Sequence, residues 1–243
     1  MTPPALVAAS SPAAPRTNVY VDGFNLYYGA AKNTPYKWVN LAALCAAVLP
    51  SIHIGRIRYF TALVKPTPSD PQIRQRQETY IRALETLQNL TVHYGHYLQS
   101  IVSARLAHPQ TGGPLFADVL KMEEKGSDVN IATYMLVDAF RSDCDQLVVI
   151  TNDSDLVEPV RIINQELKIP VGIFNPQTTD TAKRNSARLR RVVKASPSFK
   201  LREVSKFNRD ITSEGPNCHM ARCQFPNTLT DAEGRTITKP SAW

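Results

Sequence analysis

The stretch NVYVDGFNLYYGA, residues 18–30, runs from a short apolar segment into an aspartate and a glycine, and then into a helix-like segment. The apolar part predicts a buried β-strand, with Asp22 at its end. Asp and Gly are common turn residues, so a plain turn accounts for Asp22 taken alone. A functional role for Asp22 requires other carboxylates to reach the same edge of the sheet.

The rest of the sequence predicts strands that alternate with helices. β-branched and aromatic runs predict strands within residues 54–64, 90–99, 145–150 and 169–174. Apolar or amphipathic runs predict helices within residues 39–50, 71–90, 128–142 and 156–168. This alternation predicts an α/β fold with a central, mostly parallel sheet. Residues 108–116, HPQTGGPLF, are expected to form a loop or a hairpin tip.

The chain is expected to contain one domain, over residues 18–195. Residues 1–17 are rich in Pro, Ala and Ser and lack the basic start and apolar stretch of a signal peptide, so we expect a disordered leader. Residues 196–243 show no strong period and are expected to form an irregular C-terminal extension, packed on the domain or ending in a short hairpin around DAEGR. No apolar run reaches about 18 residues, so no transmembrane helix and no membrane partner are expected.

Helical spacing also predicts how two segments pack. The helix that begins at Asp128 is expected to bury an apolar face made of Val129, Ala132, Met135, Leu136, Ala139 and Phe140. Tyr27 and Tyr28 follow closely after Asp22 and have two interpretations. They either pack inward, as aromatic residues at the start of a core helix usually do, or stack on bases of a nucleic acid.

Positive charge is concentrated near the end of the predicted domain. The whole chain carries +7, and residues 183–209 alone carry +9, so the remainder is slightly acidic. Such a basic segment indicates an anionic partner, with nucleic acid as the first candidate; the alternative is a solvated helix face followed by a basic linker. The candidate RNA-binding residues are Arg184, Arg188, Arg190, Arg191 and Lys194.

Four cysteines are scattered along the chain without a CxxC pair. Cys45 and Cys144 lie in apolar segments and are expected to be buried thiols. A structural zinc site is an alternative for Cys218, His219 and Cys223, although their spacing departs from the common zinc patterns. This cysteine usage favours a reducing, cytoplasmic setting.

Four carboxylates are expected at one edge of the predicted sheet. Asp22 ends the first strand, Asp153 and Asp155 follow the strand at 145–150, and Asp128 opens the helix before that strand. In an open parallel sheet these loops line the ligand crevice, above all where the strand order reverses. Like charges so close together repel, and one or two Mg²⁺ or Mn²⁺ ions would offset the repulsion because hard cations prefer oxygen ligands.

Each acid also has an ordinary structural explanation. Asp22 and Asp153 suit turns at strand ends, and Asp128 suits a helix N-cap. Their combination at one predicted edge nevertheless favours a shared site. The sequence contains no P-loop and no GxGxxG, GxSxG or HExxH motif that would indicate a different catalytic apparatus.

Three segments, YVDGFNLYYG (20–29), EKGSDVNIATYMLVDAF (124–140) and LVVITNDSDLVEPV (147–160), together resemble the NYN domain, a branch of the PIN-like ribonucleases that includes LabA-like proteins. The resemblance covers about residues 18–195, with the motifs in the family's order and spacing. It implies a three-layer, PIN-like α/β fold with a central, mostly parallel sheet. It also implies metal-dependent cleavage of RNA phosphodiesters.

Site residues follow from the resemblance by position. The implied catalytic and metal-binding residues are Asp22, Asp128, Asp153 and Asp155. Asn25 resembles the companion of the first acid in its loop, and Thr151 stands where the family often has a Ser or Thr that hydrogen-bonds near the metal. Asn152 replaces a Gly and Leu156 a Phe found in many members. Neither departure removes a carboxylate.

The expected activity is therefore that of a metal-dependent ribonuclease, in which an activated water attacks single-stranded or structured RNA and leaves a 5′-phosphate. Ser154 would orient a ligand or the phosphate, with a helix N-cap as its alternative, and Lys125 would pair with a phosphate, with a solvated lysine as its alternative. Two other functions stay open: a non-catalytic RNA-binding regulatory module, and a small-molecule hydroxylase, since some chains that resemble this family act on a pyridine intermediate of nicotine breakdown. A homodimer also stays open.

Overall fold

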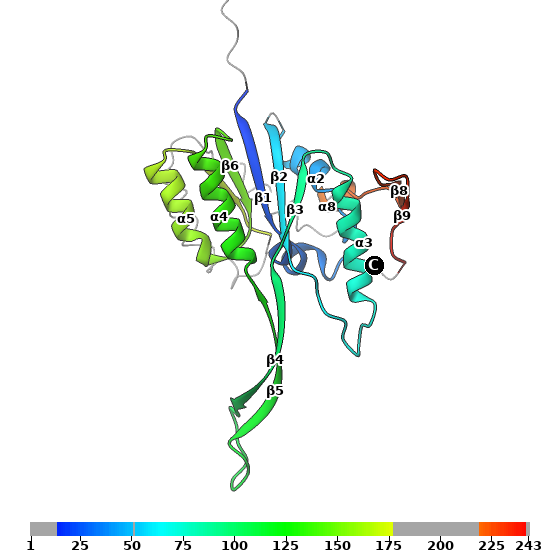
Figure 1. Cartoon of the computed structure of the whole chain (residues 1–243), viewed down its shortest axis with the longest axis vertical. Coiled ribbons are helices and arrows are strands. Elements are labelled where there is room, and N and C mark those ends of the chain that lie inside the picture. Colours follow the sequence, from blue (N-terminus) through cyan, green and yellow to red (C-terminus); the bar gives the residue numbers. More distant parts are fainter. Residues whose placement is uncertain (1–13, 51, 177–218, 242–243) are drawn as a thin grey trace, which may run out of the picture.

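A five-stranded parallel sheet forms the middle of the molecule (Figure 1), in a computed structural model that describes residues 14–50, 52–176 and 219–241. The strand order is β3-β2-β1-β6-β7, and every neighbouring pair in this sheet is parallel. The bounds are β1 (Arg16–Asp22), β2 (His53–Thr61), β3 (Leu90–Tyr94), β6 (Gln146–Ile150) and β7 (Val171–Phe174). The predicted α/β fold with a mostly parallel central sheet is confirmed.

Helices cover both faces of the sheet and complete three layers (Figure 1). α2 (Leu41–Val48) and α3 (Ile73–Glu85) lie on one face, and α4 (Ser127–Phe140) and α5 (Val157–Arg161) lie on the other. Shorter helical segments are α1 (Gly23–Leu26), η1 (Tyr27–Ala31), η2 (Ser154–Leu156), η3 (Ile162–Glu166) and α8 (His219–Arg222).

The central strands are buried on both faces, as parallel strands between two helical layers must be. Val19 and Val21 of β1 enter the core under α2 and α3, whereas Tyr20 points into the core under α4 and α5. Cys45 lies in the first core and Cys144 in the second, so the predicted burial of both thiols is confirmed.

The apolar face expected for α4 is wrong at both of its ends. Val129 and Phe140 are 68% and 81% exposed, and the buried residues include Ile131, Met135 and Asp138. The buried stripe contains Asp138 because this carboxylate meets a cationic partner on the sheet. An apolar count along the helix therefore assigns the wrong rotation.

The segment 90–99, expected to be one strand, is divided at Gly95. β3 ends in the sheet, and β4 (His96–Arg105) leaves it to pair with β5 (Phe116–Lys125) in an antiparallel arm that projects from the body (Figure 1). A Cβ at Gly95 would lie 2.6 Å from the carbonyl oxygen of Lys125, so only glycine allows this close approach at the root of the arm. Residues 108–116 lie mostly in the tip, as expected for a hairpin.

The described part of the C-terminal segment packs beside α2 and α3. The indole nitrogen of Trp38 donates to the carbonyl of Pro226 at 2.9 Å, and the Trp38 and Phe225 rings meet edge to face. β8 (Thr228–Thr230) and β9 (Thr236–Thr238) form a hairpin whose turn contains DAEGR, where a hairpin was expected. Within the described residues, no helix has the length and apolarity that crossing a bilayer requires.

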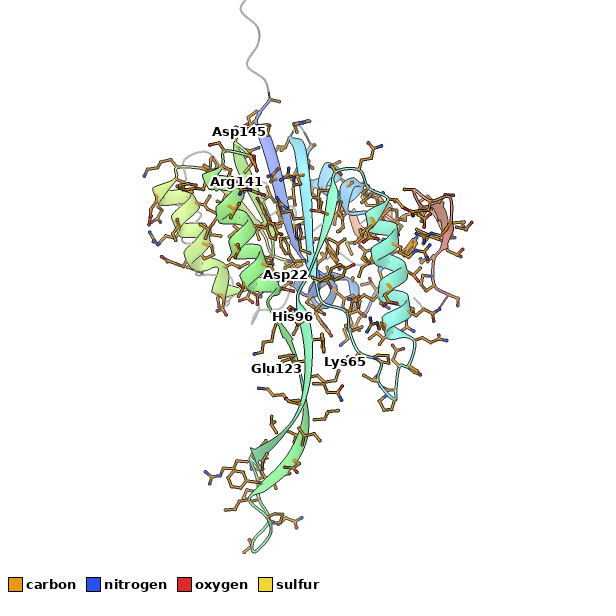
Figure 2. The ribbon with its side chains drawn as sticks, viewed as in Figure 1. Asp22, Lys65, His96, Glu123, Arg141 and Asp145 are labelled. Carbon is orange, nitrogen blue, oxygen red and sulfur yellow. The ribbon has the colours of Figure 1, made fainter. Side chains whose placement is uncertain are left out.

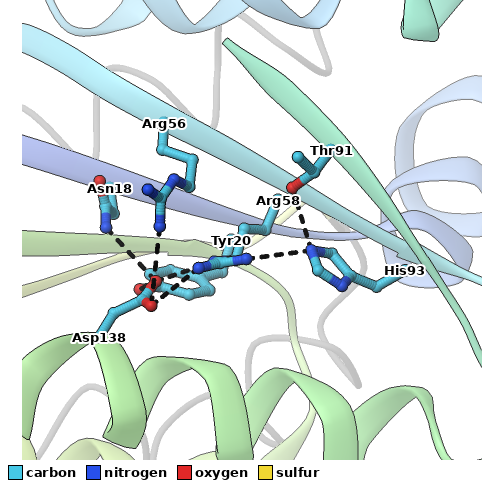
Figure 3. Close-up of polar contacts among 7 residues, drawn as sticks. All are labelled: Asn18, Tyr20, Arg56, Arg58, Thr91, His93 and Asp138. Atoms are coloured by element: carbon cyan, nitrogen blue, oxygen red, sulfur yellow. Dashed lines mark hydrogen bonds and ion pairs between the residues drawn. The ribbon is translucent and has the colours of Figure 1, made fainter. Parts of the chain in front are cut away.

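A buried ionic network ties α4 to the sheet (Figure 3). Asp138, 2% exposed, accepts two hydrogen bonds from Arg58 of β2 at 2.8 Å and one from the Tyr20 hydroxyl of β1 at 2.7 Å. Arg58 also reaches Nε2 of His93 at 3.2 Å. Burial and the Arg58 charge lower the pKa of His93 to about 4, so the ring is neutral at physiological pH.

Asp138→Ala should lower the free energy of unfolding by about 3–5 kcal/mol, because it leaves a buried guanidinium without its counter-charge. Urea denaturation measures this value. The matched control is Asp145→Ala, which breaks the exposed ion pair between Arg16 of β1 and Asp145, the residue before β6, and should change stability far less. Equal losses in the two variants would mean that the network of Asp138 does not hold α4 to the sheet.

Candidate active site

The candidate site lies where the strand order of the sheet reverses. From β1 the chain continues through β2 and β3 in one direction, whereas β6 and β7 extend the sheet in the other. Asp22 is the last residue of β1, and Thr151 follows the last residue of β6. Figure 2 shows Asp22 at this edge of the sheet, from which the arm also departs. Open α/β sheets bind ligands at this position.

Asp22 is held rigidly. Its carboxylate accepts the backbone N–H of Asn25 at 2.9 Å, the side-chain amide of Asn25 at 2.6 Å and the hydroxyl of Thr151 at 2.9 Å. Burial raises the pKa of Asp22, and these hydrogen bonds partly offset that rise. Gly23 is required next to it, since a Cβ there would lie 2.6 Å from the backbone oxygen of Phe60. The supporting positions expected for Asn25 and Thr151 are thus in contact with the first acid.

The loop after β6 carries the next two acids. The Asp153 N–H donates to the Thr151 hydroxyl at 3.1 Å, and the Asp153 carboxylate accepts the N–H of Asp155 at 2.9 Å. Asp153 is therefore the N-cap of η2, and Ser154 is an exposed residue inside that turn. The N-cap alternative for Ser154 is wrong because the residue before it already fills that position.

Asp128, in the first turn of α4, completes the group. Burial raises the pKa of Asp128 from 3.8 to about 7, and the charges of Asp153, Asp22, Glu124 and Asp155 add to the rise in that order. The charges of Asp22, Asp153 and Asp155 can act in this way only if these side chains lie near Asp128. The four acids thus lie close enough for the other three charges to act on Asp128, and α4 begins beside the η2 turn at this edge of the sheet.

Glu124 is a member of this acidic group that the sequence analysis missed. It lies near the end of β5, and its carboxylate accepts the N–H of Ser127 at 3.1 Å. The available signal was its place at the head of the EKGSD segment, four residues before Asp128. The arm that returns Glu124 to the site was not predicted, so this signal could not be used.

The structure gives Lys125, His219 and Cys223 surroundings other than the four acids, and the remaining candidates lie outside the described residues. Lys125 is exposed at the end of β5, with its amine 3.7 Å from Glu123, which Figure 2 places on the arm. Outside the described part of the chain lie Arg184, Arg188, Arg190, Arg191, Lys194 and Cys218. Cys223 is buried in the core, and His219 contacts Arg222 at 3.1 Å.

The donor chemistry of this edge suits a hard divalent cation, because the converging side chains are carboxylates. Among the residues that the structure describes, no three His, Cys, Asp or Glu side chains form a ready-made metal-binding group. Mg²⁺ usually takes only one or two carboxylates and keeps several waters, with substrate phosphates completing its shell. A cation at this edge would be held by one or two of these carboxylates, with water and a substrate phosphate completing its shell.

The profile of the NYN domain family matches residues 16–193. The chain belongs to the NYN domain family. This family is part of the PIN-like superfamily, and the match covers the whole sheet, the arm and all four acids. Membership suggests a PIN-like nuclease fold and leaves the specific activity of this NYN protein open.

Two individual proteins are similar to this NYN domain chain. The 6-hydroxy-3-succinoylpyridine 3-monooxygenase HspA of Pseudomonas putida (strain DSM 28022 / S16) is 27% identical, over 94% of this chain and 75% of its own. A solved structure, that of a protein of unknown function, VPA0982, from Vibrio parahaemolyticus RIMD 2210633, covers 73% of this chain and 92% of its own, at 16% identity and a TM-score of 0.43.

The raised pKa of Asp128 predicts a pH-dependent stability of the metal-free protein. A carboxyl that binds its proton more tightly when folded loses stability as the pH rises from about 4 through 7. In EDTA at pH 8, Asp128→Asn should therefore melt higher than the wild type, by about 2–4 °C for each kcal/mol of repulsion removed. The difference in melting temperature should become small near pH 4, because Asp128 is then protonated in the folded wild type and only partly ionised in the unfolded chain.

Differential scanning calorimetry between pH 4 and 8 makes this comparison, and Asp118→Asn on the exposed part of the arm is the control. Adding Mn²⁺ should stabilise the wild type more than Asp128→Asn, because the cation offsets the same repulsion. Parallel pH profiles for the wild type and Asp128→Asn would show that the acids do not interact as described.

Proposed function

We propose that this NYN domain protein is a metal-dependent ribonuclease. The observation that supports the proposal is the meeting of Asp22, Asp128, Asp153 and Asp155 at the strand-order reversal, with Asp22 held by Asn25 and Thr151. Asp22 and Asp153 also cap helical turns, but mutual repulsion destabilises a cluster of carboxylates at one edge, and a bound cation would offset that repulsion. The family placement points in the same direction.

A bound Mg²⁺ or Mn²⁺ would supply a water of lowered pKa and would neutralise charge on a phosphate. The residues that would hold it are Asp22, Asp128, Asp153 and Asp155. Asn25 and Thr151 fix the orientation of Asp22, and Thr151 also receives the Asp153 N–H, so one hydroxyl links two of the acids. Ser154 is exposed at the rim, where its hydroxyl would donate to a phosphate oxygen.

A test of catalysis uses a labelled single-stranded RNA with Mn²⁺, and EDTA as the metal-free control. Asp153→Asn should lower cleavage at least about 100-fold, since even an outer partner of a metal ligand typically contributes 10–100-fold. Asp118→Asn on the arm should cleave at the wild-type rate. The cleaved ends should carry 5′-phosphates. Wild-type cleavage by Asp153→Asn, or cleavage that persists in EDTA, would contradict the assignment.

The basic segment is proposed to guide the RNA backbone to the acids. Arg184, Arg188, Arg190, Arg191 and Lys194 would contact phosphates rather than bases, so their loss should weaken binding of all RNA sequences alike. Replacing Arg190 and Arg191 by Gln should reduce the slope of log affinity against log salt by about 0.7 per lost phosphate contact, measured by fluorescence anisotropy with single-stranded RNA. An unchanged slope would exclude these two residues from the RNA path.

RNA binding without cleavage in Mn²⁺ or Mg²⁺ would favour a regulatory module instead.

A second candidate is hydroxylation of a small aromatic acid. HspA, which is named for a monooxygenase reaction on 6-hydroxy-3-succinoylpyridine, aligns with 94% of this chain. One fold supports different chemistries, so the similarity to HspA is compatible with either function. NADH-dependent oxygen uptake with 6-hydroxy-3-succinoylpyridine tests this candidate directly. Uptake without any RNA cleavage would replace the nuclease proposal.

A further inference from the structure

A pocket of ≈ 290 Å³ opens beside the acids, on the side of the sheet that carries α3. Its walls come from the segment that follows Asp22, from the end of β2 and from α3. Gly23 and Phe24, the two residues after Asp22, are part of its lining. This volume lies at the lower end of the range for ligand pockets, so it suits one flat ring system about the size of a base.

The pocket walls are rich in aromatic rings. Tyr27, Tyr59 and Tyr80 line it, and the hydroxyl of Tyr80 is already used on the carbonyl of Val39 at 2.9 Å. Tyr28 lies at the rim, 55% exposed, with its ring 5.2 Å from that of Tyr27 in an edge-to-face contact. Such walls favour a flat aromatic ligand, because stacking on Tyr rings is tolerant of ring identity.

One cation in this lining has spare donor capacity. The side chain of Arg76 is 16% exposed and pairs through Nη2 with Asp70, an acid that also lines the pocket. Its Nε is buried, and no group in the described residues accepts a hydrogen bond from it. Lys37 also lines the pocket. Burial raises the pKa of Tyr27, and the nearby Arg76 charge partly lowers it again. The guanidinium of Arg76 therefore lies close to the Tyr27 side of the pocket.

The pocket and the acids share a wall. Tyr59 lines the pocket, and the Asp22 charge adds to the rise that burial causes in the pKa of this tyrosine. A Cβ at Gly23 would lie 2.7 Å from the Tyr59 hydroxyl, so glycine allows the acid loop and the pocket wall to touch. A ligand in the pocket would thus lie one residue away from the first acid.

We propose that this pocket binds one nucleotide of the RNA, with the base against the Tyr walls and an anionic oxygen at Arg76. The assignment rests on the proposed function, since the next phosphate along the strand would then reach Asp22. The base is held by stacking rather than by reading of its edge. Gln77, whose side-chain amide lines the pocket, already donates to Ala62 and Thr61 and accepts from Val64. Binding should therefore differ little among the four bases.

Titration of the four 5′-mononucleotides into the metal-free protein in EDTA, followed by NMR or calorimetry, tests the pocket without any cleavage. Arg76→Gln should weaken binding about tenfold or more, because a hydrogen bond to a charged group contributes about 1.5–3 kcal/mol. The matched control is Arg74→Gln on the same helix, whose exposed side chain pairs with Glu78 instead. Arg74→Gln should bind like the wild type. Tyr27→Ala, a second variant, should also weaken binding.

Several results would overturn the pocket assignment. These are equal binding by wild type and Arg76→Gln, an equal loss in Arg74→Gln, or no binding of any mononucleotide. Nicotinate, a pyridine carboxylate, serves as a further probe: binding of nicotinate that depends on Arg76 while no nucleotide binds would assign the pocket to small aromatic acids. Because the titration needs no catalysis, nucleotide binding in a protein that fails to cleave RNA would leave the pocket standing and remove only the nuclease proposal.

Discussion

The hydrogen bond from Thr151 to Asp22 joins the ends of two adjacent strands that lie 129 residues apart in the chain. It exists because β1 and β6 are parallel neighbours, so their carboxyl ends must fall at the same edge. Parallel pairing thus brings the acid of the first strand to the acids of the loop after β6. The same edge gathers negative charge, which adds to the rise that burial causes in the pKa of Asp128. The position of the acidic site therefore follows from the parallel pairing of β1 with β6.

The sequence was sufficient for this part because Asp22 ends β1, Asp153 and Asp155 follow β6 within five residues, and Asp128 lies in the first turn of the helix before β6. A carboxylate that directly follows a β-branched run can be placed from the sequence, because the strand ends at the edge of the sheet. Glu124 was not predicted as a site residue because it reaches the site through the β4–β5 arm. Nothing in residues 96–125 distinguishes an arm from an extension of the sheet. The division at Gly95 depends on a close backbone approach to Lys125, which is a long-range contact.

The misassigned face of α4 has a related cause. Periodicity counts apolar residues as buried and charged residues as exposed, and Asp138 reverses that rule because Arg58 is buried opposite to it. The spacing of apolar residues cannot predict a buried ion pair, because it assigns each charged partner to the surface. Val129 and Phe140 then fall on the solvent side. The same limit applies to Arg76, whose spacing on α3 gives no sign that it lines a pocket.

Charge is divided around Asp22 in a way that bears on how a polyanion would approach. The acids lie on one side, where they repel phosphate unless a cation is present. Arg76 and Lys37 lie on the pocket side with one acid, Asp70, so the pocket lining keeps a net positive charge that attracts phosphate without a cation. A nucleotide held in the pocket would therefore bring its strand toward the acids against their repulsion, and a divalent cation would turn that repulsion into attraction. Binding and catalysis would then depend on separate charges, so metal affects the second far more than the first.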